Sequence, residues 1–377
     1  MSNFPIRRVV ICAPGFPSSL DDSDKPFLLN HALALISAGF SVTVVCPSVP
    51  GLPNRQIVEG IQVTRKRYAP RRFETLAATG SMYREARGMR SIFALSMIVA
   101  LIVGALQESR RHHVTVYHGH WWVPGGLAAV IAAMLTRTKS VVHLHGSDSV
   151  VASNLFMRWM ARRVMRLATH RLAVSEALAD WGEKVSSKAV AVCSMPLSSQ
   201  FTRPAHAALS DGPVLAVGRL VHEKGFDVLI EAISRMDDAQ RHQIVIVGEG
   251  PERSELEQLA VNLNVNLTLL GSLPPKDLLI WYVKCSFVVV PSRREGFGLV
   301  AAEAAAMGRA VIGSRVGGIP EVISHGVSGL LVEAGNIDEL EIALSQLDIT
   351  WGEKGPQRVK KLTLEAHGVF LEKLYER

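Results

Sequence analysis

The sequence predicts an α/β fold made of two domains, each built around a parallel β-sheet. Its 377 residues, 48% hydrophobic and 20% charged, suffice for two globular domains of roughly 150–200 residues each. Short apolar runs alternate with longer helical patterns along the chain, which is typical of βα units and parallel sheets.

The first half of the chain contains five apolar runs that predict strands, at 9–12, 42–46, 114–117, 140–144 and 172–175. Residues 26–39 predict a helix, because their apolar side chains and His31 fall near one face and Gly39 ends the pattern. The apolar stretch 91–106 has only 16 residues, whereas a membrane-spanning helix needs about 20. We therefore expect it to form a helix packed against the first sheet.

A linker is expected at 201–213, which is rich in Pro, Ala and Ser and lacks periodicity. Beyond it the alternation restarts, and strands are expected at 214–218, 244–248, 267–270, 287–290 and 310–312. The predicted organisation is an N-terminal domain at 1–200, a C-terminal domain at 214–350, and a helical segment at 351–377 that can pack back on the first domain.

Charge is distributed unevenly along the chain. Residues 1–200 carry 23 Lys and Arg against 11 Asp and Glu, a net charge of +12, whereas residues 201–377 carry 18 against 23, a net charge of −5. A basic N-terminal half indicates an anionic partner. Charge alone does not distinguish nucleic acid from an anionic membrane surface.

The cysteines and the N-terminus indicate a cytoplasmic protein. The cysteines lie far apart, with no C-x-x-C pair and no nearby histidine ladder: Cys12, Cys46, Cys193 and Cys285. This spacing argues against zinc and against a disulfide scaffold, and it fits a reducing compartment. The first residues lack the pattern of a signal peptide, so none is expected.

Two loops of the second half carry groups suited to a sugar diphosphate. The strand at 214–217 ends in Gly218-Arg219, and Lys224 precedes the next helix. Parallel sheets bind ligands at the carboxyl ends of their strands, where Arg and Lys can grip a diphosphate. An Arg and a Lys before a helix are, taken alone, more often part of a solvated surface.

The strand at 287–290 leads into a turn with two glycines and then into an Ala-rich helix. The glycines let the backbone approach a ligand closely, and the N-terminus of the helix suits an anion. Glu295 lies in the turn, and Glu303 follows about two helical turns later. Two such carboxylates can clamp the hydroxyl pairs of a ribose and a sugar ring.

Residues 217–332 resemble the donor domain of retaining GT-B glycosyltransferases of family 4. The matching pieces are Gly218-Arg219 with Lys224-Gly225, Val247-Gly248-Glu249-Gly250-Pro251, Gly271, the Glu295-x7-Glu303 pair and Gly317-Gly318-Ile319-Pro320-Glu321. The resemblance implies two Rossmann-like domains with parallel sheets facing a central cleft, the second of which holds a nucleoside-diphosphate sugar.

The resemblance also implies roles for single residues. Arg219 and Lys224 would hold the diphosphate and stabilise the leaving group, Glu295 would lie near the transferred sugar, and Glu303 would bind the ribose. The remaining donor-binding positions are Gly15, Gly218, Gly271, Ser272, Leu273, Gly296, Phe297, Gly298, Leu299 and Val300. No resident cofactor is implied, because the nucleotide sugar is a substrate.

In the first half, the run 142–148 resembles the family's strand-end histidine motif, which implies that His145 reaches the donor sugar and acts in catalysis. His118, His120 and Asp148 are expected on the acceptor side. The chain departs from the family pattern after its first strand, where Gly15 stands alone in place of a Gly-Gly pair, and at 194–198, where an Asn-Gly-Val-Asp-like turn is absent.

No metal site is expected. Asp22-Ser23-Asp24 spells D-x-D, the metal motif of another glycosyltransferase class, but it does not directly follow a strand and predicts a turn. Arg219, Lys224 and a helix N-terminus can supply the electrostatic stabilisation that a metal would give. The implied reaction is a metal-independent hexosyl transfer with anomeric retention, by a front-face route in which the departing phosphate helps to deprotonate the acceptor.

A basic amphipathic pattern at 155–167 bears on the acceptor. Arg158, Arg162 and Arg166 recur at four-residue spacing, opposite an apolar set: Phe156, Met160, Val164 and Leu167. Such helices bind membrane surfaces, which suits a lipid-linked, cell-envelope or exopolysaccharide glycan as acceptor and an enzyme held at the inner face of the cell membrane. A solvated helix face packed on the domain core explains the pattern equally well.

Two other classes of protein remain open. A sugar-nucleotide epimerase on the same architecture would produce a new sugar without an acceptor. A non-enzymatic basic assembly or nucleic-acid-binding protein would have no use for the Glu295 and Glu303 pair, and the chain lacks the basic–aromatic interleaving of single-strand binders. Nucleic acid is therefore not expected as a partner.

Overall fold

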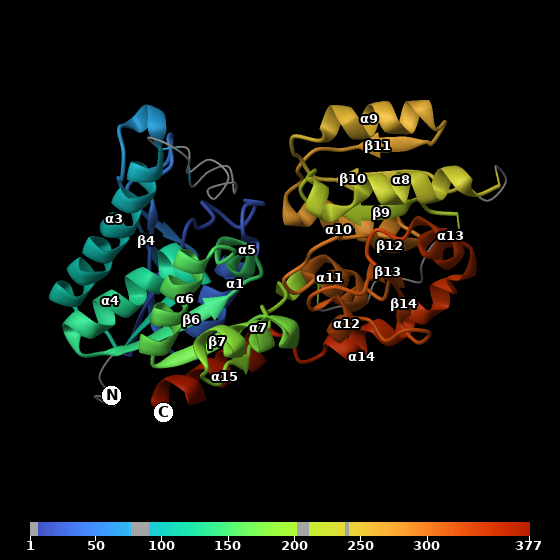
Figure 1. The fold of residues 1–377 in the computed structure, drawn as a ribbon. Coiled ribbons are helices and arrows are strands. Elements are labelled where there is room, and N and C mark those ends of the chain that lie inside the picture. The colour runs from blue at the N-terminus through green and yellow to red at the C-terminus, as the bar shows by residue number, and fades with distance from the viewer. Residues whose placement is uncertain (1–6, 75, 77–89, 202–210, 238–240) are drawn as a thin grey trace. The chain divides into compact units, whose positions relative to one another are not determined.

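The computed structural model describes residues 7–74, 76, 90–201, 211–237 and 241–377, and it forms two compact α/β units (Figure 1). The N-terminal unit comprises Met1–Pro196 and Leu364–Arg377, and the C-terminal unit comprises Leu197–Thr363. The division thus falls a few residues before the expected linker, of which residues 202–210 lie outside the described part of the chain.

The N-terminal unit contains an eight-stranded sheet with the order β3-β4-β2-β1-β5-β6-β7-β8, in which only the β3–β4 pair is antiparallel. The strands are β1 (Arg8–Cys12), β2 (Ser41–Pro47), β3 (Arg55–Val58), β4 (Ile61–Lys66), β5 (Val116–His120), β6 (Lys139–Leu144), β7 (His170–Ala173) and β8 (Ala191–Val192). The β3–β4 hairpin was not predicted, because its short strands at the sheet edge alternate buried and exposed residues and lack a continuous apolar run.

Helices cover this sheet and bury its central strands almost completely, as parallel sheets require. They are α1 (Pro26–Ser37), α3 (Arg90–Arg111), α4 (Leu127–Thr136), α5 (Ser147–Val151), α6 (Leu155–Leu167), α7 (Glu176–Ser186) and α15 (Leu364–Glu376). Short irregular helices lie at Arg71–Phe73, Trp121–Gly126 and Ser199–Phe201.

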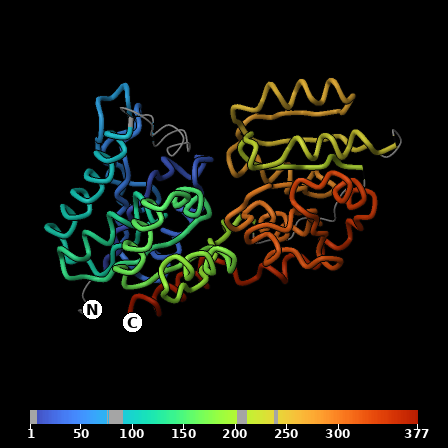
Figure 2. The backbone as a smooth tube through the Cα atoms, in the orientation of Figure 1, coloured from blue at the N-terminus to red at the C-terminus, as the bar shows by residue number. Residues whose placement is uncertain are grey.

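The last helix, α15, belongs to the N-terminal unit, and Figure 2 shows the red end of the chain among the blue and green segments. It packs closely on α1: a Cβ at Gly368 would lie 2.5 Å from the backbone oxygen of Ala34. Of the segment 351–377, only this helix lies there. The preceding α14 (Gly355–Val359) packs on the C-terminal unit, where a Cβ at Gly355 would lie 2.6 Å from the oxygen of Ala305.

The C-terminal unit contains a six-stranded sheet, parallel throughout, with the order β11-β10-β9-β12-β13-β14. The strands are β9 (Val214–Val217), β10 (Ile244–Val247), β11 (Leu267–Leu269), β12 (Phe287–Val290), β13 (Val311–Ser314) and β14 (Gly329–Val332). The helices are α8 (Phe226–Arg235), α9 (Arg253–Asn262), α10 (Pro275–Lys284), α11 (Leu299–Ala306), α12 (Ile319–Val322), α13 (Ile337–Gln346) and α14, with short turns at His222–Lys224 and Ile349–Lys354.

The apolar stretch expected at 91–106 forms the longer helix α3, of 22 residues. One face packs on the first sheet through Leu101 and Ala105, as predicted, and Met97 on the same face packs against Tyr68 and Leu76. The opposite face exposes large apolar side chains: Ile92, Leu95, Val99 and Val103. Among the described helices, this one alone is long and apolar enough to cross a membrane, a test that a core helix of a soluble protein also passes.

Candidate active site

The loops after β9 and β12 meet at the carboxyl end of the second sheet. Gly225, with φ +68°, allows this contact, because a Cβ there would lie 2.1 Å from the backbone oxygen of Pro291. Lys224 Nζ then lies 2.6 Å from Glu295 Oε2, and both side chains keep about a fifth of their surface exposed. Two of the expected donor-binding residues, far apart in sequence, are thus an ion pair.

Arg219 lies on the same loop, next to this pair. A Cβ at Gly218 would lie 3.4 Å from Lys224 Cε, so the lysine side chain passes directly over the residue before Arg219. Arg219 itself is exposed and, within the described part of the chain, forms no ion pair with an acid. Its guanidinium is available to a ligand.

The turn that carries Glu295 is held against the loop after β13. Gly317, with φ +54°, permits the approach, because a Cβ there would lie 2.0 Å from the oxygen of Glu295. Gly298 precedes α11 with φ +95°, and Glu295 Oε1 accepts a hydrogen bond from Gly296 N at 3.0 Å. The expected binding positions Gly296 to Val300 therefore form one turn at the N-terminus of α11, where unpaired N–H groups favour an anion.

Glu303 lies on α11 and is only 9% exposed. Tyr282 donates a hydrogen bond from its hydroxyl to Glu303 Oε2 at 2.9 Å. Burial raises the pKa of Glu303 from its ordinary value of 4.5 to about 7. Near neutral pH this carboxyl is therefore poised between its neutral and ionised forms.

The expected base-side loop at Gly271, Ser272 and Leu273 lies at the same edge. Gly248 N donates to the oxygen of Gly271 at 2.8 Å, and a Cβ at Gly248 would lie 1.8 Å from the oxygen of Gly218. The loops after β9, β10 and β11 therefore form a continuous rim. Glycines form the contacts of this rim because backbone meets backbone there.

In the N-terminal unit, His145 follows β6 and is partly buried. Its Nε2 lies 2.8 Å from His120 Nδ1, which leaves Nδ1 for a ligand. Burial lowers the pKa of His145 to about 3, so its imidazole is neutral at physiological pH. Its ring centroid lies 4.5 Å from that of Trp121 and 5.4 Å from that of Phe27.

His118, His120 and Asp148, expected on the acceptor side, are all buried instead. Asp148 accepts hydrogen bonds from the backbone N–H groups of Trp122 at 2.7 Å and His145 at 2.6 Å, so its carboxylate joins two strand ends. His120 and Asp148 hydrogen-bond to His145, and the ring of His118 stacks on that of His120, so these side chains help to position His145.

Lys25 is a candidate that the sequence analysis did not single out. Its side chain pairs with Asp24 at the start of α1, and a Cβ at Gly15 would lie 3.2 Å from Lys25 Nζ. In the sequence, the available signal was that Lys25 stands one residue before the helix and that Gly15 is the only glycine of the preceding loop. Asp22 accepts bonds from Ser18 and from the N–H of Asp24, as a turn residue does.

Comparison with known proteins places these loops in a wider context. A family model described as glycosyl transferases group 1 matches residues 212–348, and one described as a glycosyl transferase 4-like domain matches residues 26–198. An uncharacterized glycosyltransferase of Methanocaldococcus jannaschii is 30% identical over 275 residues, which cover 70% of this chain and 75% of that protein. A D-inositol 3-phosphate glycosyltransferase of Corynebacterium jeikeium is 36% identical over 176 residues, 42% of each chain.

Solved structures show the same fold at low identity. Sucrose-phosphate synthase from Thermosynechococcus elongatus has a TM-score of 0.79 at 20% identity and covers 98% of both chains. Anabaena HepE in complex with UDP has a TM-score of 0.73 at 17% identity, over 98% of this chain and 100% of that one.

The two parallel-sheet α/β units and their structural neighbours show the GT-B fold, as the sequence predicted, and the family models together with the 30% identical relative show that the protein is a glycosyltransferase. Within that class, the chain belongs to glycosyltransferase family 4.

Proposed function

We propose that the protein transfers a sugar from a nucleoside-diphosphate sugar to an acceptor hydroxyl with retention of anomeric configuration, and that the donor diphosphate needs no metal ion. The observation that carries this proposal is the contact between the loops after β9 and β12. There, Lys224 Nζ lies 2.6 Å from Glu295 Oε2, and the exposed Arg219 lies beside this pair. Two cations and a helix N-terminus offer a diphosphate the positive charge that a metal would otherwise supply.

Each side chain has a role in this proposal. Arg219 and Lys224 neutralise the diphosphate as the bond to the sugar breaks, and Glu295, oriented by Lys224 and the N–H of Gly296, accepts hydrogen bonds from sugar hydroxyls. Glu303 accepts from the ribose. His145, neutral and held by His120, binds the transferred sugar through Nδ1. The departing phosphate oxygen takes the acceptor proton, so no protein nucleophile is needed.

Donor selection tests this proposal directly. We expect slow hydrolysis of one member of a panel of UDP-, GDP- and ADP-sugars, measured as released nucleotide. UDP-glucose and ADP-glucose come first, because HepE was solved with UDP-glucose and Arabidopsis starch synthase IV with ADP. Arg219→Ala should reduce that hydrolysis by about 10²–10³-fold, as does the loss of a comparable charge-stabilising donor, whereas the exposed Arg358→Ala should not.

The proposal would be refuted if the protein released nucleotide from no donor of the panel faster than from any other. Conversion of the donor into an isomeric nucleotide sugar without release of nucleotide would show an epimerase instead.

For the acceptor, we propose a lipid-linked glycan of the cell envelope, met by a cytoplasmic enzyme at an anionic membrane surface. Helix α6 supports this. Leu155, Phe156, Trp159 and Leu167 are exposed, whereas Ala161, Val164 and Met165 form the packed side. Phe156 and Leu167 therefore face outward. This differs from the alternative in which the apolar side of the helix packs on the domain core.

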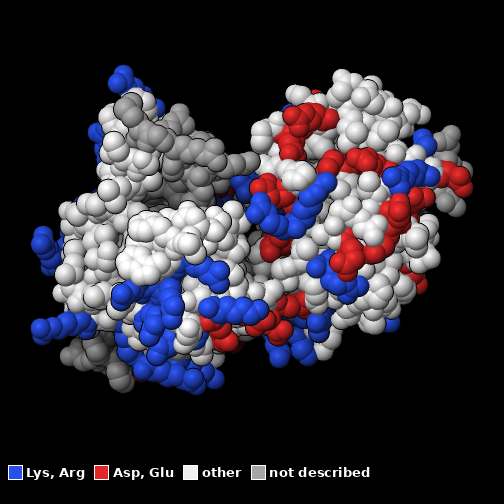
Figure 3. Space-filling view, viewed as in Figure 1, with Lys and Arg blue, Asp and Glu red and all other residues white. Residues whose placement is uncertain are grey.

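The cations of α6 border these apolar residues. A hollow of about 560 Å³ is lined by Trp159, Leu167 and four cations: Arg162, Arg163, Arg166 and Lys188. Figure 3 shows Lys and Arg gathered beside an uncharged patch over α6 in the N-terminal unit. Exposed aromatic and aliphatic groups beside cations are the combination that binds anionic lipid headgroups.

Vesicle co-sedimentation tests the membrane proposal. Binding should require phosphatidylglycerol, be absent with phosphatidylcholine alone, and weaken as salt is raised. Replacing Arg162 and Arg166 by Gln should weaken binding about 30-fold, because each basic residue near the surface contributes about 1 kcal/mol. The matched pair Arg358→Gln and Lys360→Gln, exposed in the C-terminal unit, should have no effect. Equal binding to both lipids would contradict the proposal.

A water-soluble anionic acceptor is the second candidate. It is favoured by the names of two relatives, the D-inositol 3-phosphate glycosyltransferase and an N-acetyl-alpha-D-glucosaminyl L-malate synthase of Bacillus anthracis, which is 25% identical over 252 residues. Transfer to inositol phosphate or malate, with no vesicle binding, would select this candidate over the lipid-linked glycan.

A further inference from the structure

Six histidines gather inside the N-terminal unit. His118 and His120 lie on one face of β5, and His143 and the following His145 lie on the same face of β6, because side chains alternate along a strand. The register pairs His120 with His143. His31 of α1 and His367 of α15 cover this layer, and all but His145 are at most 5% exposed.

The hydrogen bonds fix the tautomers of most of these rings. His143 Nε2 lies 2.8 Å from the carbonyl oxygen of Cys193 and must donate, so His143 Nδ1 carries a lone pair. His118 Nε2, 3.3 Å from that Nδ1, must then carry the proton, and His118 Nδ1 accepts from the hydroxyl of Tyr375 at 2.6 Å. His118 and His143 are therefore both neutral.

The same reasoning leaves one lone pair without a partner. His367 Nδ1 donates to the oxygen of Ser194 at 3.1 Å, so its Nε2 accepts the proton of His31 Nδ1 at 2.9 Å. His31 Nε2 is then an acceptor. Among the residues that the structure describes, His31 Nε2 and His120 Nε2 are buried and meet no hydrogen-bond donor or acceptor. A buried polar atom left in this state costs about 1–3 kcal/mol, so it needs an explanation.

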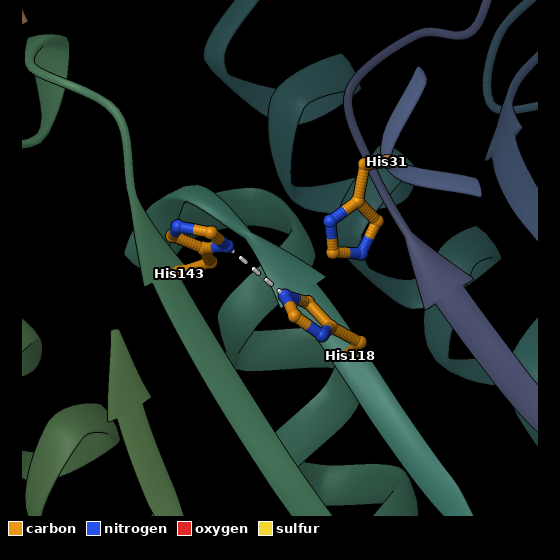
Figure 4. Close-up of side chains that lie close together, drawn as sticks. All are labelled: His31, His118 and His143. Carbon is orange, nitrogen blue, oxygen red and sulfur yellow. Dashed lines mark hydrogen bonds between the residues drawn. The ribbon is translucent and has the colours of Figure 1, made fainter. Parts of the chain in front are cut away.

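The positions of three of these rings explain why His31 Nε2 has no hydrogen-bond partner in the described part of the chain. His31, His118 and His143 each offer a ring nitrogen, and the three nitrogens lie within 4.8 Å of one another. His31 comes from α1, and His118 and His143 come from the neighbouring strands β5 and β6. Figure 4 shows the three rings around a common space. For zinc bonded to imidazole at about 2.0–2.1 Å, tetrahedral geometry separates two ligand nitrogens by about 3.3–3.4 Å. His118 Nε2 and His143 Nδ1 are 3.3 Å apart.

The other nitrogen of each ring is already held. His143 Nε2 is bonded to the carbonyl of Cys193, His31 Nδ1 to His367, and His118 Nδ1 to Tyr375. Metal-bound histidines characteristically have their second nitrogen fixed in this way. Burial, followed by neighbouring histidines, holds the pKa of all three rings well below the usual value, so their lone pairs are not protonated at physiological pH.

We propose that His31, His118 and His143 bind one divalent transition-metal ion, for which their nitrogen ligands favour Zn²⁺. His31 Nε2 and His143 Nδ1 offer their lone pairs as they stand. His118 moves its proton from Nε2 to Nδ1, and the new N–H then donates a hydrogen bond to the hydroxyl oxygen of Tyr375, whose own O–H turns away from the ring. The three rings therefore release no net proton. The sequence argument against zinc rested on chain spacing, which does not reveal a site assembled from a helix and two strands.

The role of this ion is structural. It joins α1 to β5 and β6 near their carboxyl ends. The ligand His143 is paired in the sheet with His120, which in turn contacts His145. The ion thereby fixes the strand ends that hold His145. The ion lies wholly within the N-terminal unit and takes no part in binding the donor diphosphate, so this inference stands or falls independently of the donor proposal.

Metal content and affinity test the inference on the full chain. The protein, stripped with a chelator and then equilibrated with Zn²⁺, should retain about one ion per chain, and its Tm should rise relative to the stripped form. His31→Ala should weaken Zn²⁺ binding by more than 100-fold, measured by competition with a chromophoric chelator. His367→Phe, which removes the hydrogen-bond partner of His31 together with the bond of His367 to Ser194 but leaves the three ligands in place, should weaken it about 10–100-fold. The exposed His113→Ala is the matched control and should bind as the wild type does.

Two further measurements locate the ion and guard against a misfolded variant. Co²⁺ in place of Zn²⁺ should give the visible absorption bands of a site with nitrogen ligands in the wild type. Each variant should keep near-native far-UV dichroism. His145→Ala should retain the ion, because His145 belongs to the alternative group of His120, His143 and His145. No retained ion and no Tm shift in the wild type, or loss of the ion in His145→Ala but not in His31→Ala, would overturn the assignment.

Discussion

Lys224→Ala is expected to lower kcat/KM by about 10²–10³-fold while changing the free energy of unfolding by less than about 1 kcal/mol. The two effects separate because the pair of Lys224 with Glu295 is partly exposed, where ion pairs contribute little to stability. In the proposed reaction, however, its cation faces the developing charge of the leaving diphosphate. Steady-state kinetics and urea unfolding of the same variant measure both quantities.

A double-mutant cycle sharpens this prediction. Glu295→Ala should also impair transfer, and the double variant should lose less than the two single losses combined, because the two side chains orient each other at 2.6 Å. Lys354→Ala, an exposed lysine of the same unit, is the control and should keep full activity. Strictly additive losses would show that the ion pair is incidental to catalysis.

Glu303→Gln is expected to stabilise the ligand-free protein above neutral pH while weakening donor binding. Burial raises the pKa of Glu303 from 4.5 to about 7, so between these values the folded protein binds more protons than the unfolded chain. Stability from this group therefore falls as pH rises through that window. Removing the charge should restore up to about 3 kcal/mol near pH 8, at about 1.36 kcal/mol per unit of pKa.

Donor affinity should have the opposite pH dependence. Ribose hydroxyls donate more strongly to a carboxylate than to a neutral carboxyl, so wild-type affinity should rise between about pH 6 and about pH 8 as Glu303 ionises. Glu303→Gln should bind weakly and without this rise. Urea unfolding and calorimetric titration at both pH values provide the check. A destabilised Gln variant, or a wild-type affinity that does not respond to pH, would contradict the role assigned to this carboxyl.

The donor side of the fold could be predicted from the sequence because its signals are local. Strands such as β9 and β12 are short apolar runs whose bounds the structure reproduces closely. The glycines at 225 and 317 mark turns, and their close backbone contacts explain why only glycine fits there. The contact of Lys224 with Glu295 follows once both loops are placed at one edge of a parallel sheet.

The N-terminal unit could be predicted less well because its distinctive features are long-range. The layer of histidines combines residues more than 200 positions apart, with His367 on α15 meeting His31 on α1. The H-x-H spacing at 118–120 and again at 143–145 was the available signal, since period two places both histidines of each pair on one face of a strand. The sequence left two alternatives open for α6, membrane contact or packing on the core, for a different reason: an amphipathic pattern does not tell which of its sides packs on the core.

A crystal structure with the preferred nucleotide sugar would test the central claim most directly. We predict that the donor diphosphate contacts Arg219 and Lys224, that Glu295 bonds to the sugar, and that Glu303 bonds to the ribose. A donor bound elsewhere, with those four side chains making no contact to it, would contradict the account.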